Sequence, residues 1–143
     1  SKQHGKASEY ALCASQWHKS LSYKDKFFGG GMKYDADFTK EFGYAPPYQA
    51  AESSAALLVY KDAFERANSF DTKKVRDALA ATDMQTFYGN IKFAEGGQNV
   101  SKPMVLFQVS CNDDGSKCEN KVVAPTKWAS AELVHPIPSW SKR

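Results

Sequence analysis

A single short apolar run precedes three predicted helices, and this order constrains the fold more than any other feature of the sequence. The run is YALCA, Tyr10 to Ala14. An unbroken apolar run of this length is typical of a strand covered on both faces, as in a parallel sheet. Such a strand needs parallel neighbours, and the rest of the chain does not obviously supply them. The sequence therefore reads like the end of something larger.

Helix signals fill the middle of the chain. Residues 33–42 place aromatic side chains at i, i+4 and i+8, and Gly43 stands where a helix can end in a left-handed residue. A second helix is predicted over 48–67, with small residues in its first half. Its predicted buried face follows helical spacing and consists of Ala56, Val59, Tyr60, Ala63 and Ala67.

A third helix is expected to begin after Asp71, whose side chain can cap it, with Val75, Ala78 and Leu79 on the buried side. Strands are predicted over 87–93, 103–109 and 121–124. The polar, aromatic and glycine-rich segment after Ala14 is read as loop, and Gly29 to Gly31 as a flexible connection. These elements together predict an α/β domain with a β-rich C-terminal end.

Two cysteines bracket a turn in SCNDDGSKC, residues 110–118. Asp114-Gly115 is a turn signal between residues of strand type, so paired strands would bring Cys111 and Cys118 opposite each other. We expect a disulfide, which implies an oxidising compartment; two reduced thiols are the alternative. Cys13 is left over inside the apolar run, where we expect a buried and inert thiol.

Composition and motifs argue against several classes of protein. The net charge of +3 is spread along the chain, which predicts no nucleic-acid partner. No apolar run approaches the length of a membrane-spanning helix. The three histidines lack metal-ligand spacing, and phosphate-loop and nucleophile motifs are missing, so we expect no metal, no cofactor and no catalytic residue. Cys13 with a histidine is the remaining enzymatic alternative.

Four stretches taken in order resemble the C-terminal part of a solute-binding protein of the branched-chain amino acid type of ABC transporter. They are SQWHKSLSYKD, FTKEFGYAPPYQAAESSAALLVYKDAFERA, DTKKVRDALAATDMQTFYGNIKFAEGGQNVSKPMVLFQV and VVAPTKWASAELVHPIPSW. The resemblance covers nearly the whole chain. Its most specific part is FGYAPPYQAA, followed at family spacing by KVRDALAATDMQTFYGNIKF.

The resemblance implies the type I periplasmic-binding-protein fold, in which two Rossmann-like lobes clamp a ligand between them. A full member is much longer than this chain. Residues 1–43 would belong to the second lobe and the hinge, residues 44–105 to the first lobe, and residues 106–143 to the crossover strands and tail. The missing N-terminal part would supply the sheet partners of the orphan strand. Exposed strand edges would also favour dimers or swapped assemblies.

The resemblance also implies candidate ligand-binding residues. Its main clamp lies upstream of this chain, but the family's aromatic residue at the start of the returning helix corresponds to Tyr48. The alternative for Tyr48 is a core aromatic that fixes the helix start. Trp17, near the presumed hinge, can line the cleft or pack in the core. Glu52 lies one turn beyond Tyr48, where a carboxylate also gains from the helix dipole without any ligand.

The implied protein is not an enzyme. It is a periplasmic binding component that delivers a small organic ligand to the membrane permease of an ABC importer. The ligand would be a branched-chain or other amino acid, or an aromatic acid, and closure of the lobes would desolvate it. A ligand-sensing regulatory or receptor domain of the same fold is the alternative, and a fused signalling segment would distinguish it.

Overall fold

The computed structural model describes residues 4–142, which form two compact units. Unit 1 combines the residues up to Gln16 with those from Met104 onward, and unit 2 comprises Trp17–Pro103. Each unit buries apolar side chains of its own. None of the helices in the described part of the chain is long and apolar enough to cross a membrane.

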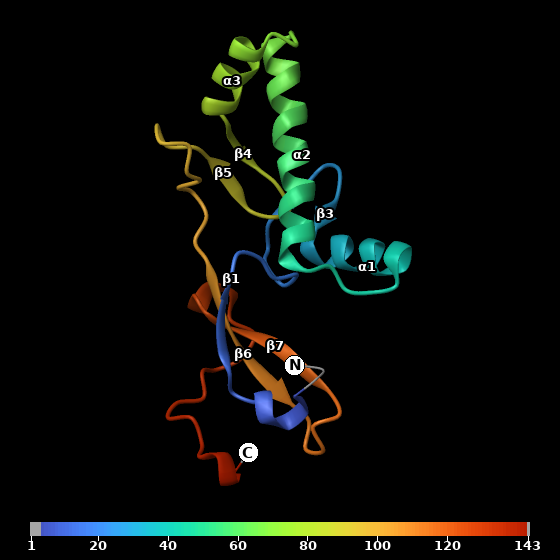
Figure 1. The fold of residues 1–143 in the computed structure, drawn as a ribbon, viewed down its shortest axis with the longest axis vertical. Coiled ribbons are helices and arrows are strands. Elements are labelled where there is room, and N and C mark those ends of the chain that lie inside the picture. Colours follow the sequence, from blue (N-terminus) through green and yellow to red (C-terminus); the bar gives the residue numbers. More distant parts are fainter. Residues whose placement is uncertain (1–3, 143) are drawn as a thin grey trace. The chain divides into compact units, whose positions relative to one another are not determined.

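Unit 1 contains a three-stranded antiparallel sheet in the order β1-β6-β7. The long strand β6 (Val105–Cys111) lies between β1 (Leu12–Ser15) and β7 (Cys118–Ala124), as Figure 1 shows. A short 3-10 helix, η1 (Gly5–Ser8), precedes β1. Val105, Val109 and Val122 are the buried aliphatic side chains of this unit.

The predicted environment of β1 is wrong. This strand lies at the edge of the sheet and pairs antiparallel with β6, whereas we expected a strand covered on both faces beside parallel neighbours. Leu12 and Cys13 are both exposed, so Cys13 is not the buried thiol that the sequence suggested. The physical reason is that unit 1 places no second layer over these side chains.

The disulfide between Cys111 and Cys118 is confirmed. The two residues pair across β6 and β7, and a tight turn joins the strands. Asn112 N–H donates to the Lys117 carbonyl at 2.9 Å, and Gly115, with φ at +69°, provides the left-handed residue that the turn needs. The predicted strand over 121–124 is therefore only the second half of β7.

The C-terminal tail lies against the same sheet. It contains two short 3-10 helices, η2 (Thr126–Trp128) and η3 (Trp140–Lys142), and extended chain between them. The Val122 carbonyl accepts the Ser130 N–H at 2.8 Å, and the Gln108 side-chain oxygen accepts the Val134 N–H at 2.9 Å. These bonds hold the proline-broken tail to β6 and β7.

Unit 2 contains three α-helices, and the first begins two residues before the predicted start at residue 33. They are α1 (Gly31–Phe42), α2 (Tyr48–Ala67) and α3 (Thr72–Ala80). Gly43 ends α1 with φ at +76°, and its N–H donates to the Thr39 carbonyl. The Asp71 side chain accepts the Lys74 N–H at 3.0 Å, which confirms it as the N-cap of α3.

An aromatic core organises the segment that the sequence suggested was loop. Trp17, Tyr34 and Phe87 are almost fully buried. The ring of Phe87 stacks on Tyr34 with centroids 4.2 Å apart, and Phe28 packs against both. The short strands β2 (Lys24–Asp25) and β3 (Gly29–Gly30) pair within this segment. The segment is thus ordered by distant aromatic partners rather than by a local signal.

Gly31 is part of this ordered structure and not of a flexible connection. It is the first residue of α1, and a Cβ atom at this position would lie 2.6 Å from the Lys19 carbonyl oxygen. Glycine is therefore required here for a close approach of two backbone segments.

The predicted strand over 87–93 is a hairpin instead. Strands β4 (Asp83–Gln85) and β5 (Asn90–Lys92) pair antiparallel, and Phe87 lies in the turn between them. The Thr86 hydroxyl donates to the Gly89 carbonyl at 3.0 Å and closes the turn. Asp83 to Gln85 carry too few apolar residues to be recognised as a strand by pattern.

The buried face of α2 only partly matches the predicted one: Val59 and Ala63 are buried as expected, but Ala56 and Tyr60 are exposed. Its buried residues are Ala51, Ala55, Leu58, Val59 and Ala63, so the face is turned by about one residue. On the opposite side lie Leu57, Tyr60 and Phe64, which are 68%, 50% and 38% exposed. We call these three residues the outer stripe. Both sides of α2 are apolar, and spacing alone could not select between them.

Candidate functional site

Tyr48 is the first residue of α2 and is 39% exposed. Pro47 precedes it in an extended conformation and sets the direction in which the helix begins. Tyr48 therefore presents a ring and a hydroxyl at the start of a helix without being enclosed in the core. The alternative of a fully packed core aromatic does not describe this residue. Its contact with a ligand stays a prediction.

Glu52 lies one turn after Tyr48 and is exposed. Residues four apart are neighbours on one side of a helix, so the carboxylate and the tyrosine share a surface. The turn between β4 and β5 approaches the same surface through Tyr88, because both Glu52 and Tyr48 act electrostatically on the Tyr88 hydroxyl. Tyr88 itself is 5% exposed.

Lys102 completes this group and was not singled out from the sequence. Its Nζ lies over the Tyr88 ring, 4.2 Å from the centroid, which is a cation–π contact. Its aliphatic stem lies against Gly89, where a Cβ atom would come within 2.6 Å of the Lys102 Cε. We call Tyr48, Glu52, Tyr88 and Lys102 the polar cluster of unit 2.

Burial shifts the pKa values of Lys102 and Tyr88, the two least exposed members of the polar cluster. It lowers the pKa of Lys102 to about 8, although the nearby Glu52 carboxylate acts in the opposite direction. Burial also raises the pKa of Tyr88 well above its ordinary value, with smaller contributions from Glu52 and Tyr48. At neutral pH the cluster thus holds a protonated Lys102 amine and a neutral Tyr88 hydroxyl.

Trp17 lies in the aromatic core of unit 2. It is 5% exposed, and its ring meets Tyr34 and Phe87 edge-on at centroid distances of 5.9 and 6.1 Å. The packing role that the sequence allowed is the one that these contacts describe. Contact between Trp17 and a ligand stays a prediction.

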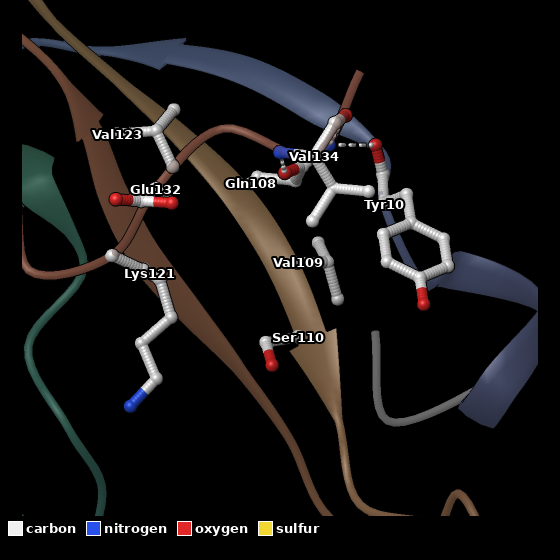
Figure 2. A pocket seen from close by; sticks show the side chains of 9 residues that line it. Tyr10, Gln108, Val109, Ser110, Lys121, Val123, Glu132 and Val134 are labelled. Atoms are coloured by element: carbon white, nitrogen blue, oxygen red, sulfur yellow. Dashed lines mark hydrogen bonds between the residues drawn. The ribbon is translucent and has the colours of Figure 1, made fainter. Parts of the chain in front are cut away.

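Unit 1 has a cavity of about 140 Å³ between the sheet and the C-terminal tail. Figure 2 shows Tyr10 and Val134 on one side of this cavity, with Lys121 and Glu132 on the other. The amide nitrogen of Gln108 donates to the Tyr10 and Val134 carbonyls, and Lys121 pairs with Glu119 at 2.7 Å. The wall of the cavity therefore consists of apolar side chains and of polar groups that already bond to other protein groups. None of the predicted site residues lines this cavity.

Other candidate chemistry from the sequence has little support in the structure. Among residues 4–142, no three His, Cys, Asp or Glu side chains gather as a metal site would require. Asp62 and Glu65 form ion pairs with Arg66 and Lys61 on the surface of α2, as expected for a solvated face.

The chain matches the periplasmic binding protein family over residues 2–117. It belongs to that family. Its fold is similar to the leucine-binding protein LivK of Thermotoga maritima, with a TM-score of 0.64 and 24% identity. It is also similar to a periplasmic binding protein of Burkholderia mallei, with a TM-score of 0.68 and 18% identity.

The two similarities cover 86% and 90% of this chain, but only 33% and 35% of the solved proteins. The chain thus spans about a third of the length of these periplasmic binding proteins. The predicted family and fold class are confirmed, and the family supports a binding role rather than catalysis.

Of the four residues in the polar cluster, the sequence predicts Tyr48 and Glu52 as candidates and does not single out Tyr88 and Lys102. Tyr48 lies within FGYAPPYQAA, the part of the sequence that most specifically resembles the family, and Glu52 follows it by one turn. Tyr88 and Lys102 reach the same surface from a turn and an extended segment that are distant in sequence. The glycine in TFYGN was the one available signal, since a glycine within a strand-like run often marks a close approach.

Proposed function

We propose that this chain is the C-terminal part of the solute-binding protein of an ABC importer. The complete protein binds a small organic ligand between two lobes and delivers it to a membrane permease. The ligand is a branched-chain or other amino acid, or an aromatic acid. The observation that carries the proposal is the family match over residues 2–117. A periplasmic location accords with the Cys111–Cys118 disulfide, since disulfides persist in oxidising compartments.

In this proposal residues 1–43 belong to the second lobe and hinge, residues 44–105 to the first lobe, and residues 106–143 to the crossover strands and tail. Tyr48 contributes to the wall of the ligand cleft. Its partial exposure at the start of α2 supports that role. Closure of the lobes removes water from the ligand and forms the surface that the permease recognises.

The outer stripe of α2 supports the existence of a large missing partner. Helix α2 carries large apolar side chains on the side opposite its buried face, and contiguous exposed apolar side chains of this kind often mark a contact surface. Tyr60 and Phe64 continue into Phe70, which is 90% exposed, and the rings of Phe64 and Phe70 lie 5.5 Å apart. Since this chain covers about a third of the solved proteins, we propose that the upstream part of the same protein covers the stripe.

A ligand screen on the complete protein tests the function. Amino acids and aromatic acids are added one at a time, and the thermal midpoint of unfolding is measured. A true ligand raises the midpoint. The Tyr48→Ala variant should need at least a tenfold higher ligand concentration to show the same rise. Tyr44→Ala, which removes another exposed tyrosine of unit 2, should leave it unchanged. No response to any compound would contradict the proposal.

A second experiment tests the outer stripe. Tyr60→Asp with Phe64→Asp should lower the free energy of unfolding of the complete protein by about 3 kcal/mol or more, because it places charges in a buried contact. The same double variant should change the isolated chain of 143 residues by less than about 0.5 kcal/mol. Lys61→Gln with Lys73→Gln changes the net charge equally and serves as the control.

Equal effects in the two proteins would contradict an upstream partner for the stripe. The isolated chain could instead form a dimer that the double variant converts to a monomer. That result would identify a second copy of the chain as the partner that covers the outer stripe.

A further inference from the structure

The cavity between the sheet and the tail of unit 1 is separate from the residues that the proposed function uses, since all of its lining residues belong to unit 1. We propose that this cavity is a second binding site, which takes a small amine. An apolar body of about six carbon atoms fills the cavity, and the ammonium group lies beside Glu132. The inference is independent of the proposed ligand cleft, because Tyr48 lies in unit 2.

The shape of the cavity is fixed by the hydrogen bonds that attach the tail to the sheet. The Ser130 N–H donates to the Val122 carbonyl at 2.8 Å. Further along the tail, the Gln108 side chain accepts the Val134 N–H at 2.9 Å and donates to the Val134 carbonyl at 3.2 Å. The tail is therefore attached both before and after Glu132, so the wall that it forms is in place before a ligand arrives. A preformed wall reduces the ordering cost of binding.

Tyr10 lines the cavity in a backbone conformation that is rare for a bulky residue (Figure 2). Its φ is +64°, in the left-handed region, where a side chain of this size is seldom found. The Tyr10 N–H donates to the Val109 carbonyl at 2.8 Å, and the Tyr10 carbonyl accepts the Gln108 amide at 3.2 Å. Conformations of this kind persist where the surrounding structure holds them, and they gather at binding sites. The strain at Tyr10 therefore supports a function for this wall.

The interior of the cavity favours an apolar ligand body. Gln108 is 4% exposed, and its amide already bonds to the main chain of Tyr10 and of Val134. Val109 and Val123 add apolar surface. A polar group placed here without a partner would lose its hydrogen bonds to water. A cavity of about 150 Å³ is large enough to hold benzene, so the volume of about 140 Å³ accommodates a body of about six carbon atoms.

The charges beside the cavity favour an amine over an acid. Lys121 and Glu132 lie on the side away from Tyr10 (Figure 2). The Glu119 carboxylate lies 2.7 Å from the Lys121 amine and offsets its charge. Glu132 is exposed and has no ion-pair partner within residues 4–142. These three side chains leave one negative charge, which an ammonium group complements. Because this charge is exposed, the apolar body supplies most of the affinity.

The test measures binding of cyclohexylamine to the complete protein by NMR titration, with cyclohexanecarboxylate as the anionic probe that carries the same ring. We expect a dissociation constant on the order of 1 mM or lower for the amine, as the size of such a ligand allows. Glu132→Gln should reduce the preference for the amine over the acid about tenfold. Asp113→Asn removes the same charge from the hairpin turn of unit 1, outside the cavity, and should leave the preference unchanged.

Two further variants locate the bound probe. Ala131→Phe places a ring in the cavity and should weaken binding of cyclohexylamine at least tenfold. Ala129→Phe adds the same ring at an exposed position that does not line the cavity, and binding should not change. Tyr10→Gly removes one wall and suits the left-handed backbone, so it should also weaken binding at least tenfold without depending on the fit of a new ring.

Binding of cyclohexylamine that is unchanged in both Ala131→Phe and Tyr10→Gly would place the probe elsewhere and overturn the inference. Failure of the complete protein to bind cyclohexylamine would overturn it as well. A preference for the amine that survives Glu132→Gln would contradict the assignment of the ammonium group to Glu132. Each of these results would leave the proposed function intact, because the ligand screen tests the cleft in the other unit.

Discussion

The two units of this chain hold distant segments together by different means. Unit 1 depends on the main chain and on specific polar or covalent links: β1 pairs with β6 although the paired residues are 90 to 96 positions apart, Gln108 holds the tail, and a disulfide closes the hairpin. Unit 2 depends on apolar contact, with Phe87 at the centre of an aromatic core. Unit 1 should therefore be sensitive to reduction, and unit 2 to loss of buried volume.

The largest expected effect is loss of the aromatic core. Phe87 is fully buried and contacts Trp17, Phe28 and Tyr34. Phe87→Ala should lower the free energy of unfolding by about 3–5 kcal/mol, because it removes a buried ring and leaves a cavity. Urea denaturation followed by tryptophan fluorescence measures this change. Phe70→Ala, at a 90% exposed ring, is the matched control and should change the isolated chain little.

The same comparison explains which parts of the fold could be predicted. The ends of α1 and α3 depend on Gly43 and Asp71, which act on their own neighbours in sequence, and the disulfide depends on a local turn. The aromatic core joins Trp17 to Phe87, seventy positions apart, and no local pattern reports such contacts. The predicted covering of YALCA is wrong and the predicted face of α2 is only partly right, for a related reason. Both predictions rest on the spacing of apolar side chains, and this spacing does not identify the part of the protein that packs against them.

The candidate site divides in the same way. Tyr48 and Trp17 could be named because the family resemblance implies an aromatic at the start of α2 and a hinge after YALCA, and Glu52 because it lies one turn beyond Tyr48. Lys102 could not, because its role depends on the burial of Tyr88 and the missing side chain at Gly89. Neither property can be predicted from the residues next to Lys102 in the sequence.

A smaller effect is expected from the covalent link of unit 1. Cys111→Ser with Cys118→Ser should lower the free energy of unfolding by about 2–3 kcal/mol, as expected for a short closed loop. The corresponding experiment is denaturation with and without reductant, and the double variant should lose the response to reductant. Cys13→Ser removes the exposed free thiol, and this variant should keep the response to reductant. A wild-type chain that is indifferent to reductant would show that unit 1 does not need the link.

The smallest effect concerns pH and unit 2. The pKa of Lys102 is about 8 in the folded chain, against an ordinary value of 10.5, so the unfolded chain binds more protons between these pH values. The free energy of unfolding of the wild type should therefore rise with pH between about 8 and 10.5, relative to Lys102→Met. We expect about 1 kcal/mol, less than the full shift implies, because Lys102 is only partly buried. Parallel curves for the two proteins would show that the amine is not desolvated.

We propose that this chain supplies part of one ligand cleft whose remainder lies upstream. The direct measurement is calorimetric titration of a ligand found in the screen into the complete protein and into the isolated chain of 143 residues. We predict one site with micromolar or tighter affinity in the complete protein, and binding at least a hundredfold weaker by the isolated chain. Equal affinity in the two would contradict the claim, because the site would then be complete within this chain.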